Sequence, residues 1–107
     1  MNIKYKTKDL EKSLTNRRLC LREFGCLTDT LMRKLDAIQA AASCRDLFNI
    51  SGHLHELRHH AKGVYGLNIK HPYRLLIAVD PATVTVLGIV DYHNKTSRIA
   101  SFSNFNN

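Results

Sequence analysis

The sequence predicts an α+β fold in which N-terminal helices pack on one face of a mostly antiparallel sheet. Apolar residues recur at helical spacing from Lys8 to about Ser43. After Gly52 the chain carries apolar and β-branched runs that are separated by short turn signals. Because the helical and strand patterns occupy separate halves of the chain, they indicate an α+β fold rather than an alternating α/β fold.

The N-terminal half begins with a weak strand signal and continues as helix. Ile3 and Tyr5 alternate with lysines, which is typical of a short strand. Leucines then recur at helical spacing, and a break is expected within the segment TNRRLC. Gly25 is expected to end this helical region, because glycine is common just past a helix C-terminus. Thr28 or Asp29 is expected to cap the next helix.

The most strongly patterned element is a helix that starts near Leu27 and runs to about Ser43. Its apolar residues fall on one stripe, which consists of Leu27, Leu31, Leu35, Ile38 and Ala42. Charged residues lie off this stripe, so the helix is amphipathic and buries one side. The segment DLFNISGH that follows is expected to be a connector.

The second half of the chain is expected to form hairpin-linked strands. A short, imperfect strand signal surrounds His55, and three stronger ones are VYGLNIK, YRLLIAV and TVTVLGIVD. The segments HP and DPAT between them are turn signals. Residues 1–93 are expected to form one domain, and the polar residues 94–107 a loosely held C-terminal extension.

Composition narrows the class of protein. The 107 residues suffice for one small domain, with no apolar run as long as a membrane span and no signal-peptide pattern. Three cysteines without paired spacing favour reduced thiols, so a cytoplasmic protein is expected. The net charge is +7, with ten Lys/Arg against six Asp/Glu in the first fifty residues and six against three in the rest. This spread of charge favours a polyanionic partner such as nucleic acid, the ribosome or an acidic protein.

Several polar side chains in the strand-rich half are candidate site residues. The catalytic candidates are His55, Arg74, Asp91 and His93, and the substrate-binding candidates are Arg58, Lys62 and Tyr92. Each of them alone is better explained as a surface residue, an ion-pair partner or a turn residue. No metal site is expected in HLHELRHH, because it lacks matched acidic or cysteine ligands, and no cofactor is expected.

Together these residues suit the cleavage of a phosphodiester. Antiparallel strands can bring residues that are distant in sequence onto a shared face. Two imidazoles that titrate near neutrality can move protons, and an arginine can stabilise charge on the phosphoryl oxygens. RNA supplies its own nucleophile in the 2′-hydroxyl, so general acid–base catalysis needs no metal.

Two segments of the chain resemble the RelE/HigB family of bacterial toxins, in the branch called plasmid-maintenance killer proteins. LHELRHHAKGVYGLNIKHPYRLLI is similar to the family's Leu-His-x-Leu-Lys-Gly-x-x-x-Gly stretch and its Tyr/Trp-Arg-apolar strand. VDYH matches the family's terminal Asp-Tyr-His. The resemblance covers residues 1–93. The chain departs from the family at His59-His60, where Gly-Asp is common, and in its extension beyond His93.

The resemblance implies a RelE-like microbial RNase-type fold and the toxin of a type II toxin–antitoxin system. Such a toxin is an mRNA endoribonuclease (an mRNA interferase) that acts on the ribosome, and a HigA-like helix-turn-helix antitoxin neutralises it. The implied roles are proton transfer by His55 and His93, assistance by Asp91, and charge stabilisation by Arg74. Arg58 stands where the family usually has lysine and would share that stabilisation, while Tyr92 would stack on a base or shape the site.

Three other functions remain open. A ParE-like toxin shares the fold and acts on DNA gyrase without nuclease chemistry, but it lacks the histidine pair. An antitoxin or killer-suppression partner should carry a helix-turn-helix or a disordered arm, and the helical half shows no such spacing. A nonspecific RNA-binding domain should present more aromatic residues than the four Tyr and four Phe found here.

Overall fold

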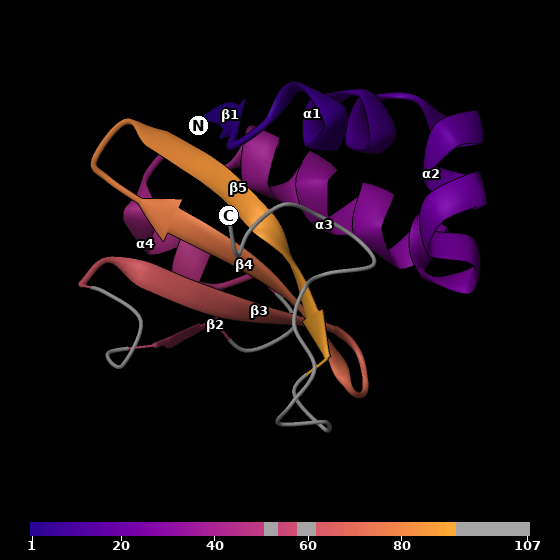
Figure 1. Cartoon of the computed structure of the whole chain (residues 1–107). Coiled ribbons are helices and arrows are strands. Elements are labelled where there is room, and N and C mark those ends of the chain that lie inside the picture. Colours follow the sequence, from indigo (N-terminus) through magenta and orange to yellow (C-terminus); the bar gives the residue numbers. More distant parts are fainter. Residues whose placement is uncertain (51–53, 58–61, 92–107) are drawn as a thin grey trace.

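The computed structural model describes residues 1–50, 54–57 and 62–91 (Figure 1). In chain order the elements are β1 (Asn2–Tyr5), α1 (Lys8–Thr15), α2 (Arg17–Phe24), the 3-10 turn η1 (Gly25–Leu27), α3 (Thr28–Ala40), α4 (Cys44–Phe48), β2 (Leu54–Glu56), β3 (Val64–Lys70), β4 (Tyr73–Val79) and β5 (Thr83–Asp91).

The strands form one sheet of five strands in the order β1-β5-β4-β3-β2. β2, β3, β4 and β5 are successive antiparallel neighbours. β1 joins the sheet as the parallel neighbour of β5, with Ile3 opposite Val84. The helical segment between β1 and β2 carries the chain from one edge of the sheet to the other. These features confirm the α+β class with a mostly antiparallel sheet.

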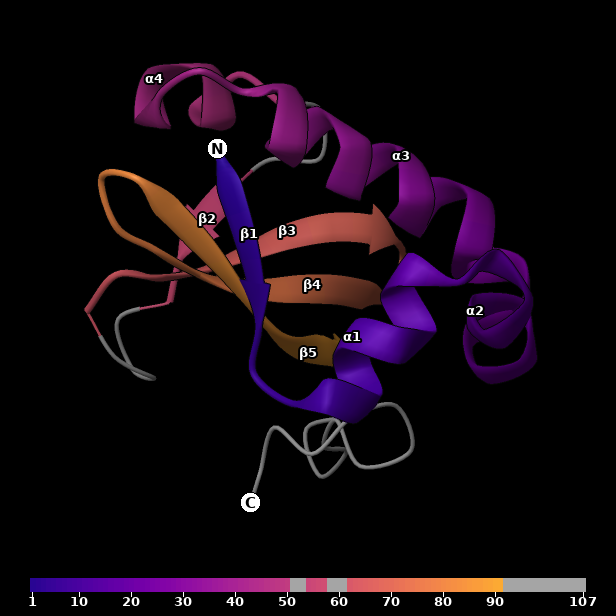
Figure 2. The same ribbon diagram turned by 90° about the horizontal axis from the view of Figure 1, so that it is seen from above.

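All four helices contribute to a core on one face of the sheet. Figure 2 shows α3 lying along the sheet beside β3, with α2 next to the N-terminal end of α3. The buried side chains of this main core are Leu10, Leu14, Cys20, Phe24, Leu27, Leu31, Leu35, Ile38, Leu47, Leu67, Leu75, Ile77, Val84, Val86 and Ile89. Their burial is the main force that holds the helical layer on the sheet.

The opposite side of the sheet, here called the second face, carries a smaller apolar cluster. It consists of Leu57, Val64, Leu76 and Val90, with Leu87 packed against it. These residues alternate with main-core residues along each strand, since successive side chains of a strand point to opposite faces. Leu76 in β4, for example, is fully buried between Leu75 and Ile77 of the main core.

The helix boundaries confirm some predictions and correct others. Asn16 ends α1 and caps α2 by accepting from the Leu19 N–H, so the break in TNRRLC is confirmed. Gly25 ends α2 with a φ of 53°, in the left-handed range that glycine tolerates best. The predicted cap at Thr28 or Asp29 is wrong, because η1 leads directly into α3 and no side chain caps its start.

The main helix is shorter than the apolar stripe indicated. α3 ends at Ala40, because Ala41 adopts an extended conformation with ψ of 134°. Ser43 then caps a further helix, α4, by accepting from the Asp46 N–H. The connector predicted after Ser43 is therefore partly helical, and Leu47 of α4 is buried in the main core.

The N-terminal strand is fastened to the end of α3. The amino group of Met1 donates to the Gln39 carbonyl at 2.9 Å and to the Ala41 carbonyl at 2.5 Å. Carbonyls at a helix C-terminus lack intrahelical partners and attract positive charge. This contact fixes β1 between α3 and β5.

Within the described ranges, no helix combines the length and the apolar character that a membrane crossing requires. Residues 94–107 lie outside those ranges, so the proposed C-terminal extension stays a prediction.

Candidate active site on the second face

His55 and the middle of the sheet lie on one row of paired residues. His55 of β2 pairs with Gly66 of β3, Gly66 pairs with Leu76 of β4, and Leu76 pairs with Gly88 of β5. Directly paired residues of neighbouring strands share a face. Because Leu76 belongs to the second-face cluster, the exposed side chain of His55 also lies on the second face.

Arg74 lies on the same face, two residues before Leu76 in β4. It pairs with Asn68 of β3 and with Val90 of β5, and Val90 is a member of the second-face cluster. Arg74 is half-buried. Its Cδ lies 3.6 Å from the position that a Cβ on Gly66 would occupy. The side chain of Arg74 therefore leans from β4 across β3, toward the strand that carries His55.

The two residues lie on strands that are separated only by β3. β2 and β4 are therefore about 10 Å apart at a spacing of about 4.8 Å per strand, and Arg74 is displaced by a further two residues along the strands. The Arg74 side chain extends over Gly66 and so covers part of that separation. The structure thus brings together an imidazole and a guanidinium that lie nineteen positions apart in the sequence.

Asp91 lies at the end of β5, and its face follows from its pairing; its catalytic role stays a prediction. Asp91 pairs with Tyr73, and Tyr73 packs against the main core on the helix-covered face. No register shift separates Asp91 from Ile89, which is also a main-core residue. The period-two alternation of the strand therefore directs Asp91 and Arg74 to opposite faces of the sheet.

The remaining predicted site residues divide into two groups. Lys62 is exposed in the turn before β3, beyond the start of the strand that carries Gly66. Arg58, Tyr92 and His93 lie outside the described residues, and their proposed roles stay predictions.

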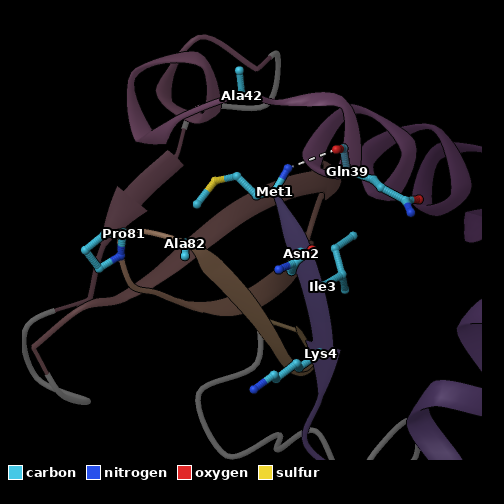
Figure 3. A pocket seen from close by; sticks show the side chains of 8 residues that line it. All are labelled: Met1, Asn2, Ile3, Lys4, Gln39, Ala42, Pro81 and Ala82. Atoms are coloured by element: carbon cyan, nitrogen blue, oxygen red, sulfur yellow. Dashed lines mark hydrogen bonds between the residues drawn. The ribbon is translucent and has the colours of Figure 1, made fainter.

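Two second-face residues were missed by the sequence reasoning. Lys4 of β1 pairs with Thr85, while its neighbours Ile3 and Tyr5 pack against the main core. Figure 3 shows Lys4 directed away from Ile3. Asn68 is the direct partner of Arg74 and is half-buried. The alternation around each residue assigns its face, but only the strand pairing shows which functional residue lies beside it.

Two surface pockets lie away from His55 and Arg74. One has a volume of about 850 Å³ and opens at the start of β1, between the end of α3 and the turn at Pro81 (Figure 3). The other, of about 330 Å³, lies on α3 and is lined by Arg33 and Lys34 together with Thr30, Ala37 and Ile50. Burial, followed by the neighbouring Arg33, lowers the pKa of Lys34.

Among the described residues, no three His, Cys, Asp or Glu side chains are grouped so that they could hold a metal ion. In comparisons with known proteins, no family model, no curated protein and no solved structure matches this chain. The chemistry of the second face and the sequence motifs are therefore the guides to function.

Proposed function

We propose that this protein is the toxin of a type II toxin–antitoxin system and cuts messenger RNA on the ribosome. The observation that carries the proposal is the placement of His55 and Arg74 on one sheet face, with the Arg74 side chain leaning toward the strand of His55. The net charge of +7 and the resemblance of the LHELR and VDYH segments to RelE/HigB toxins support it.

The proposed reaction is a transfer within the RNA chain. The 2′-oxygen attacks the adjacent phosphorus, the bond from phosphorus to the 5′-oxygen breaks, and a 2′,3′-cyclic phosphate and a 5′-hydroxyl result. His55 and His93 share the two proton transfers, one from the 2′-hydroxyl and one to the leaving 5′-oxygen. Arg74 stabilises the extra charge on the phosphoryl oxygens through its planar guanidinium.

The other candidates have supporting roles in the proposed mechanism. Lys62, in the turn before β3, and Lys4, on β1, contact other phosphates of the same RNA strand. Arg58 and Tyr92 keep their proposed roles in substrate binding. Asp91 acts from the helix-covered face, so its role is to position the residues that follow it rather than to contact the phosphate.

The direct test is cleavage of mRNA on programmed ribosomes, read by toeprinting. His55→Ala and Arg74→Ala should each lower the cleavage rate by about 100-fold or more, as is typical when a proton-transfer group or a charge-stabilising donor is removed. Arg45→Ala is the matched control, because Arg45 is an exposed arginine on α4, within the helical layer.

Other outcomes would contradict the proposal in identifiable ways. Gyrase-linked DNA breaks without mRNA cleavage would assign the chain to the ParE-like class. If the product of an adjacent gene arrested growth and this chain reversed the arrest, this chain would be the antitoxin. Full cleavage activity in both substituted proteins would remove His55 and Arg74 from the mechanism.

A further inference from the structure

Gly66 occupies a central strand position where glycine is unfavourable. Glycine weakens a strand because it loses more conformational freedom on folding and packs no side chain. The left-handed glycines among the described residues are Gly25 and Gly63, and Gly88 also has a positive φ, but Gly66 does not. The backbone conformation at position 66 therefore does not require glycine.

The space above Gly66 is instead occupied by two neighbouring side chains. A Cβ at this position would lie 3.3 Å from Cδ1 of Leu57 and 3.6 Å from Cδ of Arg74. Leu57 is buried in the second-face cluster and so has little room to move. An alanine methyl would press on Leu57 and touch Arg74 at ordinary van der Waals distance, whereas a β-branched side chain would take the space of the Arg74 stem.

The side chain of Arg74 runs over the space that Gly66 leaves open. The direct partner of Arg74 on β3 is Asn68, so a Cδ placed over Gly66 shows that the side chain runs diagonally, two residues along β3. Gly66 is in turn the direct partner of His55 on β2. The path across the bare glycine therefore leads from the Arg74 backbone toward His55.

We infer that Gly66 is a positioning residue that leaves open the path by which the Arg74 guanidinium reaches the reacting phosphate beside His55. This inference rests on the proposed endoribonuclease function. Gly66 contacts no substrate itself, and its effect on the reaction passes through Arg74.

A double-mutant cycle between Gly66 and Arg74 tests this role. Gly66→Val should lower kcat for mRNA cleavage at least about tenfold with KM within about threefold, because the guanidinium is misplaced where charge develops in the transition state. Gly66→Ala should have a smaller effect of the same kind. In the Arg74→Ala background, either change at position 66 should lower kcat no further. Independent, multiplying losses would show that Gly66 acts on stability alone and would overturn the inference.

The matched control is Ala78→Val, which adds two methyl groups on the second face of β4 at a site paired with Val64 and Thr85. Its cleavage rate should stay within about twofold of the parent's, and a loss equal to that of Gly66→Val would overturn the inference. Urea unfolding shows which of these proteins is folded. If Gly66→Val is unfolded, Gly66→Ala takes its place in the double-mutant cycle.

A measurement without activity separates this inference from the proposed function. The Nε–Hε signal of Arg74 in a ¹⁵N NMR spectrum should move in Gly66→Val and stay in place in Ala78→Val. An unmoved signal would overturn the positioning role even if the parent cuts mRNA. A parent that cuts no mRNA, with the signal shifted as expected, would instead overturn the proposed function.

Discussion

Arg74 and Asp91 lie on neighbouring strands, but their side chains leave the sheet on opposite faces. In the proposed mechanism only Arg74 reaches the phosphate. We therefore expect Arg74→Ala to lower kcat by about 100-fold or more, and Asp91→Asn to cost much less than the roughly 100-fold typical of a proton-transfer group. Single-turnover cleavage on programmed ribosomes measures both, and equal losses would place the Asp91 carboxylate at the phosphate.

The cysteines differ sharply in reactivity according to their surroundings. Cys20 is fully buried in the main core, and burial raises the pKa of its thiol, while Cys26 is exposed. Only the thiolate reacts with alkylating reagents. In the native protein, iodoacetamide should modify Cys26 first, and Cys20 only at the rate at which the core opens. Mass spectrometry of a labelling time course measures this, and equally rapid modification of both residues would contradict the described core.

The spacing of apolar residues predicts whether a segment is a helix or a strand, but it predicts poorly where that helix or strand begins and ends. The α3 stripe and the three long strands were predictable, because each buries one face of a regular element. The end of α3 and the existence of α4 were not, because alanines suit both sides of the break and the cap at Ser43 is a local hydrogen bond.

The candidate site was predictable in its residues more than in its geometry. The identities of His55 and Arg74 suggested phosphodiester chemistry, and the pairing of β2, β3 and β4 places both on the second face. The face of Asp91 was not predictable, because adjacency to a strand end does not reveal the face on which a residue lies. The register of β5 against β4 decides that, and register depends on long-range pairing.

The stability of the helical layer should depend on α3, since its apolar residues pack directly on the sheet. Ile38 is fully buried in the main core, whereas Asp36 is exposed on the same helix. Ile38→Ala should lower the free energy of unfolding by about 2–5 kcal/mol, through lost burial and the cavity that remains. Asp36→Ala should change it by less than about 0.5 kcal/mol. Urea denaturation measures both, and a small effect at Ile38 would mean that α3 is not part of the cooperative core.

For the whole molecule, the net charge of +7 should govern binding to RNA. Each phosphate neutralised on a single strand contributes a slope of about −0.7 in log affinity against log salt. If Lys4, Lys62 and Arg74 each neutralise one phosphate, affinity for a single-stranded RNA should fall about 20-fold from about 50 to 200 mM salt. Lys4→Ala should make the slope shallower by about 0.7.

The control for this measurement is Lys12→Ala, because Lys12 is an exposed lysine on α1. Its slope should equal that of the parent. An equal change for Lys4→Ala and Lys12→Ala would show that RNA senses only the total charge and not the second face.

The parallel pairing of β1 with β5 has a consequence for how the protein is made. Ile3 and Tyr5 find their partner strand only when the segment around Val84 and Val86 has left the ribosome. Until then the leucines of the emerging helices have no sheet to cover, and such late, long-range pairing delays folding. A nascent chain that lacks β5 therefore cannot form the complete sheet. If the folded protein attacks translating ribosomes, the ribosome that synthesises it is spared until β5 has emerged and paired with β1.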